Sequence, residues 1–169
     1  MESPEDMVDV VDKNDVTIGA MKRKDLLARK ANFRTVHVFL LNKKGELLLQ
    51  KVPASRTRAP GWGSSAAAYV RSGESYDEAA KRIVEEELRL RNVLLEFRGK
   101  AAMTDSGCRK FISLYKAVHD GPVTLLPGFT EGAEFLTFGK IGDLAEHRSR
   151  EFTPAFLYLL DFLLAKGKR

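Results

Sequence analysis

The strongest structural signal in this 169-residue chain is a helix over residues 75–88. Ser75 is followed three residues later by Glu78, a capping-box pair in which each side chain accepts a hydrogen bond from a free backbone N–H at the helix start. Runs rich in β-forming residues lie on both sides of this helix, at 35–41, 46–52, 93–103, 110–118 and 133–138. Strands around one central helix predict an α+β fold with a mixed β-sheet.

A second helix is predicted over residues 153–165, at the end of the chain. Thr153 is a good N-cap, and Pro154 suits the first helical position because its missing N–H would have no partner there anyway. Strands, a central helix, more strands and this closing helix together predict an αβα sandwich. A short helix over residues 141–146 is also expected.

The first 30 residues are expected to form a small appendage to this core. Extended segments at 8–12 and 16–20 flank Lys13-Asn14-Asp15 and predict a hairpin, and residues 22–30 predict a short exposed helix. No linker or repeat divides the chain. We therefore expect one domain over residues 1–169, with a hairpin and short helix in 1–30 and the core in 31–169.

The charge balance favours anionic partners without choosing among them. Lys and Arg number 28 against 23 Asp and Glu, a formal net charge of +5, which suits nucleic acid, a membrane surface or phosphorylated small molecules, or serves solubility alone. The longest apolar stretch, 156–165, is shorter than the ~20 residues that span a bilayer. Cys108 is the only cysteine, and residues 1–15 lack the apolar region of a secretory leader. These features predict a cytoplasmic protein that does not cross a membrane.

Two adjacent glutamates on the predicted central helix are candidate metal ligands. Glu86 and Glu87 lie one turn beyond Ile83, and residues three and four apart share one side of a helix. Their carboxylates therefore converge on one edge, where they could share a hard cation such as Mg²⁺. Arg82 is near enough to offset their repulsion. The alternative is a solvated acidic face with ordinary i,i+4 ion pairs.

The residues around these glutamates resemble the box of the Nudix hydrolases, G-x5-E-x7-R-E-U-x-E-E-x-G-U, where U is a bulky apolar residue. Six of the nine specified positions match: Glu74, Arg82, Val84, Glu86, Glu87 and Leu90. The order of predicted strands and helices also fits the Nudix αβα sandwich. The resemblance therefore covers most of the chain.

Three positions depart from the box. Ile83 stands where family members have a glutamate that binds metal or acts as a base. Because a general base supplies ~10²–10⁴-fold, about 3–5 kcal/mol of barrier, we expect slow turnover and expect Ile83→Glu to raise it. Arg89 replaces a glycine at the helix end, where a cation complements the helix dipole. Ala68 replaces the first glycine and is acceptable if its backbone angles are ordinary.

The segment before the box is similar to that of the isopentenyl-diphosphate isomerase-like branch of the superfamily. It reads Leu47-Leu48-Leu49-Gln50-Lys51, followed by Arg56 and Pro60-Gly61. In that branch two basic residues contact a diphosphate, so the resemblance assigns substrate binding to Lys51 and Arg56, with Arg58 as a substitute. An exposed basic loop is the alternative. Residues 64–68 read Ser-Ser-Ala-Ala-Ala and lack the isomerase cysteine, which disfavours isomerase activity.

The resemblance implies metal-dependent hydrolysis of a diphosphate linkage in a nucleotide or another small organic diphosphate. Glu86 and Glu87 would hold Mg²⁺ or Mn²⁺, and Glu74 and Arg82 would brace the loop and helix. A later loop often adds a carboxylate, which could be Glu131 as a metal ligand or Glu134 as a catalytic group.

Three other functions stay open. A Nudix-fold protein that binds phosphates without useful turnover is the first. A nucleic-acid-binding module is less favoured, because the basic residues are dispersed without the aromatic side chains of a base-stacking surface. The wide apolar surface of the last helix suits core burial or a homodimer.

Overall fold

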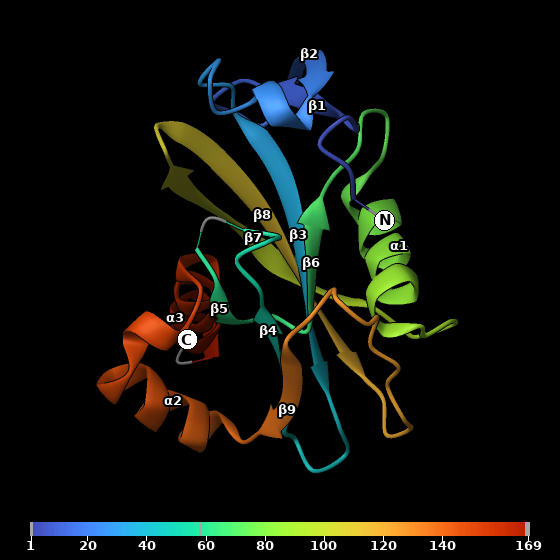
Figure 1. Ribbon diagram of the computed structural model, residues 1–169, viewed down its shortest axis with the longest axis vertical. Coiled ribbons are helices and arrows are strands. Elements are labelled where there is room, and N and C mark those ends of the chain that lie inside the picture. The colour runs from blue at the N-terminus through green and yellow to red at the C-terminus, as the bar shows by residue number, and fades with distance from the viewer. Residues whose placement is uncertain (1, 58, 168–169) are drawn as a thin grey trace.

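The structure is a computed structural model that describes residues 2–57 and 59–167. A seven-stranded mixed sheet lies between helices on its two faces (Figure 1). Its strands run in the order β5 (Gly61–Gly63), β4 (Leu47–Val52), β3 (Phe33–Leu41), β8 (Cys108–Val118) and β7 (Glu96–Asp105); β6 (Ala66–Tyr69) pairs with β3 and β9 (Gly132–Leu136) pairs with β4. The predicted α+β sandwich with a mixed sheet is confirmed.

Strands β3 and β4 leave the hairpin that joins them in different directions. They pair only at Leu41 and Leu47, next to the turn. Beyond that point β3 pairs with β8 in parallel and with β6, whereas β4 pairs with β5 and β9. The sheet therefore separates into two parts along one line, and the space between β3 and β4 becomes available for a ligand.

Helix α1 (Tyr76–Leu88) covers one face of the sheet and begins with the predicted capping box. Ser75 Oγ accepts from Glu78 N–H at 3.1 Å, and the Glu78 carboxylate accepts from Ser75 N–H at 2.8 Å. The helix buries Ala79, Ala80, Ile83, Val84 and Leu88 against β3, β6 and β8. Because these apolar residues set the orientation of α1 on the sheet, the Glu87 side chain points toward the space between β3 and β4.

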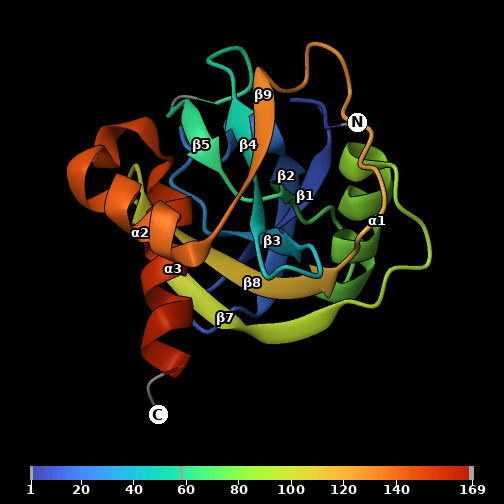
Figure 2. The ribbon, with the colours of Figure 1, turned by 90° about the horizontal axis from the view of Figure 1, so that it is seen from below.

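Helices α2 (Phe138–His147) and α3 (Pro154–Gly167) cover the opposite face (Figure 2), with the 3-10 helix η2 (Ser149–Glu151) between them. Thr153 Oγ1 accepts from Phe156 N–H at 3.3 Å, as expected of an N-cap. Phe156 and Leu159 of α3 are fully buried against the sheet. Core packing thus covers much of the apolar surface of α3. No helix in residues 2–57 and 59–167 is long and apolar enough to span a bilayer.

The N-terminal hairpin forms as predicted, from β1 (Met7–Val11) and β2 (Thr17–Lys22). It packs on the core through a small buried cluster that includes Phe33 and Cys108. The predicted helix over 22–30 is wrong in length, since only the 3-10 helix η1 (Arg23–Asp25) forms. So short a segment cannot offset the cost of helix nucleation, and the backbone turns at Lys30, where φ is +50°.

Candidate active site

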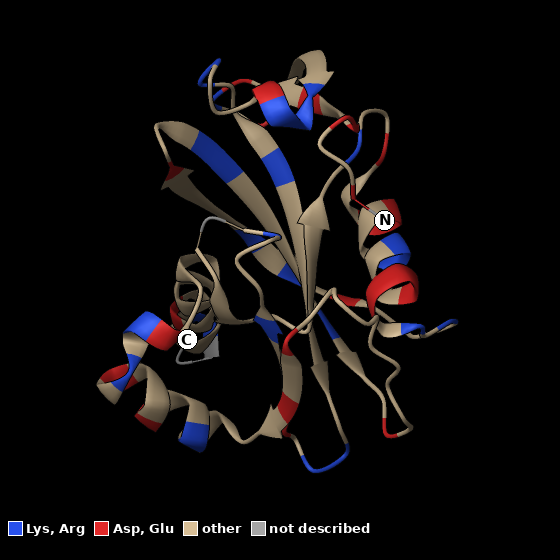
Figure 3. Ribbon diagram, in the orientation of Figure 1, with Lys and Arg blue, Asp and Glu red and all other residues tan. Residues whose placement is uncertain are grey.

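A cavity of about 890 Å³ opens where β3 and β4 diverge. Its wall combines basic, acidic and neutral polar side chains from several elements. They include Arg23, Arg56 and Lys110; Glu2, Glu87 and Asp105; and Thr35, His37, Gln50 and Ser64. A cavity of this size is typical of small-molecule sites. Basic residues elsewhere are spread over strands, loops and helices (Figure 3).

Glu87 projects from α1 into this cavity and is almost completely buried, with 5% of its surface exposed. Its Oε2 accepts from Ala67 N–H at 3.3 Å, and its Oε1 lies 3.7 Å from Arg56 Nη2. Burial raises the pKa of Glu87 to about 8, although Arg56 opposes the shift. The side chain is therefore mainly protonated at neutral pH in the metal-free protein, and a bound cation would favour the charged form.

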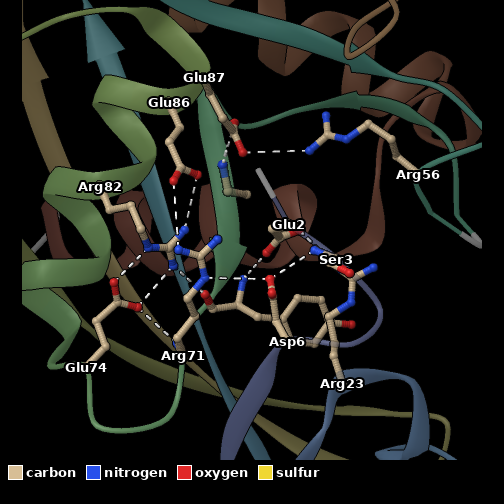
Figure 4. A network of polar contacts seen from close by, with 12 residues as sticks. Glu2, Ser3, Asp6, Arg23, Arg56, Arg71, Glu74, Arg82, Glu86 and Glu87 are labelled. Atoms are coloured by element: carbon tan, nitrogen blue, oxygen red, sulfur yellow. Dashed lines mark hydrogen bonds and ion pairs between the residues drawn. The ribbon is translucent and has the colours of Figure 1, made fainter.

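Arg56 reaches Glu87 from the loop between β4 and β5 (Figure 4). Its guanidinium lies 3.2 Å from the centre of the Phe129 ring, and Nη1 donates to the Phe129 carbonyl at 2.9 Å. Burial lowers the pKa of Arg56, with Glu87 acting against it. Phe129 therefore holds a partly desolvated positive charge in the site.

Glu86 lies one residue before Glu87, beside two arginines. Arg82 Nη1 is 3.4 Å from Oε2 of Glu86, and Arg71 Nη1 is 3.9 Å from Oε1 (Figure 4). Glu86 and Glu87 both border a second, much smaller cavity of about 10 Å³, which Glu2 also lines. This is roughly the space that one water molecule needs.

Glu74 and Arg82 form the ion pair that the box predicts. Arg82 Nε and Nη2 lie 2.7 and 3.0 Å from the two carboxylate oxygens of Glu74, and Nη2 also donates to the Tyr69 carbonyl at 3.0 Å. Burial alone would raise the pKa of Glu74, but hydrogen bonds from Arg82 and from Arg71 N–H hold it below its ordinary value. The pair joins α1 to the end of β6.

The three departures from the box have different structural settings. Ile83 is fully buried in the apolar cluster under α1 and borders neither cavity. Ala68 is paired with Val36 in the sheet, so its backbone is ordinary extended chain. Arg89 ends α1 with φ of +56°, in the left-handed region that glycine adopts without strain.

Several residues predicted from the sequence lie away from the cavity. Lys51 points out of β4, with Nζ 3.8 Å from Glu131. Glu131 and Glu134 are both exposed, and neither these two nor Lys51 belongs to the cavity wall that the structure describes. Arg58 falls outside the described residues. Of the predicted site residues, the structure brings together Glu74, Arg82, Glu86, Glu87 and Arg56.

The sequence did not point to Glu2 or Arg23. Glu2 Oε1 accepts from Tyr69 N–H at 2.6 Å, and Oε2 lies 3.0 Å from Arg23 Nη1. The sequence carries one weak signal for this contact. Residues 2–6 are acidic, and the basic residues Lys22-Arg23-Lys24 stand at the end of the hairpin that follows them.

His37 of β3 is also buried in the wall of the large cavity. Its Nδ1 lies 2.7 Å from Ser64 Oγ, and burial lowers its pKa to about 3, so it is neutral at physiological pH.

The carboxylates suit a divalent cation with few protein ligands. No three His, Cys, Asp or Glu side chains of residues 2–57 and 59–167 are arranged as a metal cage. Mg²⁺ does not require one, because it commonly takes one or two carboxylates and completes its shell with water and substrate phosphates. Glu86 and Glu87 supply two such carboxylates beside a small cavity, so the donor set fits.

Comparison with known proteins agrees with this architecture. A family model for the NUDIX domain matches residues 31–156. A Nudix hydrolase of Pseudomonas aeruginosa, PA4841, is 31% identical over 163 residues, 96% of this chain and 95% of that protein. The isopentenyl-diphosphate Delta-isomerase 2 of Photorhabdus laumondii is 35% identical over 80 residues, 47% of this chain and 45% of that one.

A solved structure has the same fold over nearly the whole chain. The crystal structure of DR0079 from Deinococcus radiodurans superposes with a TM-score of 0.79 at 23% identity, and the match covers 93% of this chain and 98% of that one. Nudix hydrolases generally use divalent metal ions, which agrees with the paired carboxylates. From the family match and the box residues on α1, the chain belongs to the Nudix hydrolase superfamily.

Proposed function

We propose that this protein hydrolyses the diphosphate linkage of a small organic diphosphate, nucleotide or other, with Mg²⁺ or Mn²⁺. One observation carries the proposal: Glu87 of the box helix and Arg56 of the preceding loop meet, 3.7 Å apart, on the wall of a cavity large enough for such a ligand. A metal-binding carboxylate beside a guanidinium is the chemistry that a diphosphate needs, since its oxygens bind both cations and planar donors.

Glu86 and Glu87 would hold the cation, which when bound would neutralise phosphate charge and activate water. In the structure each glutamate forms ion pairs with arginine. Glu86 pairs with Arg82 and Arg71, and Glu87 pairs with Arg56. With Glu87 engaged by a cation, the guanidinium of Arg56 could turn to the phosphate oxygens. Phe129 would keep that guanidinium inside the cavity.

The remaining parts of the site position these groups. Arg82 and Glu74 fix the start of α1 relative to β6. The same geometry offers no obvious role to Lys51, Glu131 or Glu134, which lie outside the cavity wall. We place the activity in the cytoplasm, where the single buried Cys108 would stay reduced.

A Nudix-fold phosphate binder with little turnover is the second candidate. Two observations favour it. Ile83 is buried in the core and leaves the position of the usual third glutamate without a carboxylate. Glu87 has a pKa of about 8, so most molecules of the metal-free protein would carry it uncharged at neutral pH, and the uncharged form binds a cation poorly.

The experiment that separates these functions is a substrate screen with Mg²⁺ or Mn²⁺. The panel contains nucleotide sugars, dinucleotides, nucleoside triphosphates and prenyl diphosphates, and the readouts are products of diphosphate cleavage and ligand binding. Glu86→Gln and Glu87→Gln should abolish cleavage. Glu85→Gln, on the outer side of the same helix, should not. Binding without cleavage by any member would favour the phosphate binder, and neither binding nor cleavage would contradict both candidates.

A further inference from the structure

The first residues of the described chain lie against the candidate active site. Glu2 borders both the large cavity and the small one that Glu86 and Glu87 share. Figure 4 shows its carboxylate between the N-terminal segment and the residues of the Nudix box. Residues 2–6 are here called the N-terminal arm, and the Glu2 side chain of this arm occupies part of the site that a ligand would enter.

The surroundings of the Glu2 carboxylate are those of a bound anion. One oxygen accepts from Tyr69 N–H at 2.6 Å and the other lies 3.0 Å from Arg23 Nη1. Burial raises the pKa of the Glu2 carboxyl, and the Tyr69 N–H and the charges of Arg23, Arg56 and Arg82 oppose that shift. A backbone N–H and a guanidinium that converge on one charged group are equally suited to a phosphate.

Side-chain ion pairs and two backbone hydrogen bonds hold the rest of the arm: Arg23 N–H donates to the Asp6 carbonyl at 2.9 Å, and Lys24 N–H donates to the Pro4 carbonyl at 3.1 Å. Asp6 lies 3.6 Å from Arg71 Nε, and Glu5 lies 2.8 Å from Lys22 Nζ. The Glu5 and Lys22 side chains are about half exposed, and exposed ion pairs of this kind contribute little to stability. A ligand that offers more negative charge than Glu2 would have to break these few contacts to displace the arm, and none of them belongs to the buried core.

We propose that the N-terminal arm is a built-in competitor, with the Glu2 carboxylate in the place that a phosphate of an anionic ligand takes. Diphosphate binding then requires the arm to leave, and the measured affinity is reduced by the fraction of molecules whose arm is in place. The inference rests on the proposed function only in that the ligand carries a diphosphate group, and it does not require turnover.

The alternative role for Glu2 is that of a third metal ligand, because its side chain lines the small cavity together with Glu86 and Glu87. The two roles have opposite consequences. A competitor weakens the binding of inorganic diphosphate and does not contribute to the binding of Mn²⁺. A third carboxylate ligand would strengthen Mn²⁺ binding, and its removal would weaken it. Binding measurements on one variant therefore decide between them.

The test is isothermal titration of the full chain, tagged at its C-terminal end, with inorganic diphosphate in EDTA and separately with Mn²⁺. Glu2→Gln should bind diphosphate about tenfold more tightly than the wild type, because the arm no longer competes. The matched control is Glu5→Gln, on the same arm but outside both cavities, and its affinity should stay within twofold of the wild type. Mn²⁺ affinity should be unchanged in both variants.

Amide hydrogen exchange supplies an independent readout. Diphosphate should speed exchange in residues 2–6 of the wild type, because it displaces the arm. Unchanged or weaker diphosphate binding by Glu2→Gln, loss of Mn²⁺ affinity, or slower exchange in the arm would each overturn the inference. Absence of diphosphate binding in every variant would overturn it too. If Glu2→Gln binds diphosphate tenfold more tightly but the protein hydrolyses no substrate, the proposed hydrolase function is wrong and the competitor role of the arm is supported.

Discussion

Arg82 holds both carboxylate oxygens of Glu74, through Nε at 2.7 Å and Nη2 at 3.0 Å. Glu74 lies in the loop before α1, and Arg82 lies two turns into the helix. The same guanidinium donates to the Tyr69 carbonyl at the end of β6 and lies 3.4 Å from Glu86. One side chain thus connects the strand, the loop and a candidate metal ligand.

We expect Glu74→Gln to lower the free energy of unfolding by about 2 kcal/mol, because it removes charge-assisted hydrogen bonds and leaves Arg82 without its main partner. Urea unfolding of the metal-free protein measures the change. The control is Glu85→Gln, on the same helix, which breaks the exposed pair with Arg91 and should cost less than about 0.5 kcal/mol. Equal costs for the two variants would mean that Glu74 contributes no more than a surface ion pair.

Local features of the site were predictable from sequence because they depend on spacing along one helix. The capping box of Ser75 and Glu78 and the proximity of Arg82 to Glu86 follow from i,i+3 and i,i+4 geometry alone. The box spacing likewise led to the pairing of Glu74 with Arg82. The mixed sheet and both main helices followed from the order of strand-like and helix-like segments.

Features that depend on tertiary packing could not be predicted in this way. Leu47 to Gln50 are buried without interruption, so the sequence showed no alternation to reveal that Lys51 points away from the cavity. Glu2 reaches a backbone N–H that lies 67 residues further along the chain. No local pattern reports a contact at that separation.

The structure changes our expectation for Ile83→Glu. From the sequence we expected faster turnover, but Ile83 is fully buried among apolar side chains and borders neither cavity. A carboxylate there would lack a partner, so we now expect the variant to lose about 3 kcal/mol or more of stability and gain no turnover. Ile83→Val, which keeps the site apolar, should cost only about 1 kcal/mol. A stable Ile83→Glu protein with faster metal-dependent cleavage would restore the original expectation.

Glu87 should make stability fall as the pH rises. Its pKa is about 8 in the folded protein because of burial, against an ordinary value of 4.5. Between these values the unfolded chain has released the proton and the folded protein still binds it. Stability from this group is thus fully present below about pH 4.5 and is lost as the pH rises to about 8.

Urea unfolding in EDTA at several pH values, compared between wild type and Glu87→Gln, measures this dependence. Glutamine resembles the protonated acid and does not titrate, so the variant should gain stability relative to the wild type over the same pH window. Parallel curves for the two proteins would show that Glu87 titrates at its ordinary pKa. EDTA matters because a bound cation would hold the carboxylate in its charged form.

Arg56 and Lys51 allow a charge-matched test of which basic residue binds the diphosphate. Arg56 lines the cavity and lies 3.7 Å from Glu87, whereas Lys51 is exposed beside Glu131. Loss of a charge-assisted hydrogen bond costs about 1.5–3 kcal/mol, so Arg56→Met should weaken binding of inorganic diphosphate about 10- to 100-fold. Lys51→Met removes the same net charge and should change the affinity less than twofold. If the two variants weaken binding equally, the basic residues act through overall charge, and the position of Arg56 over the Phe129 ring has no special role.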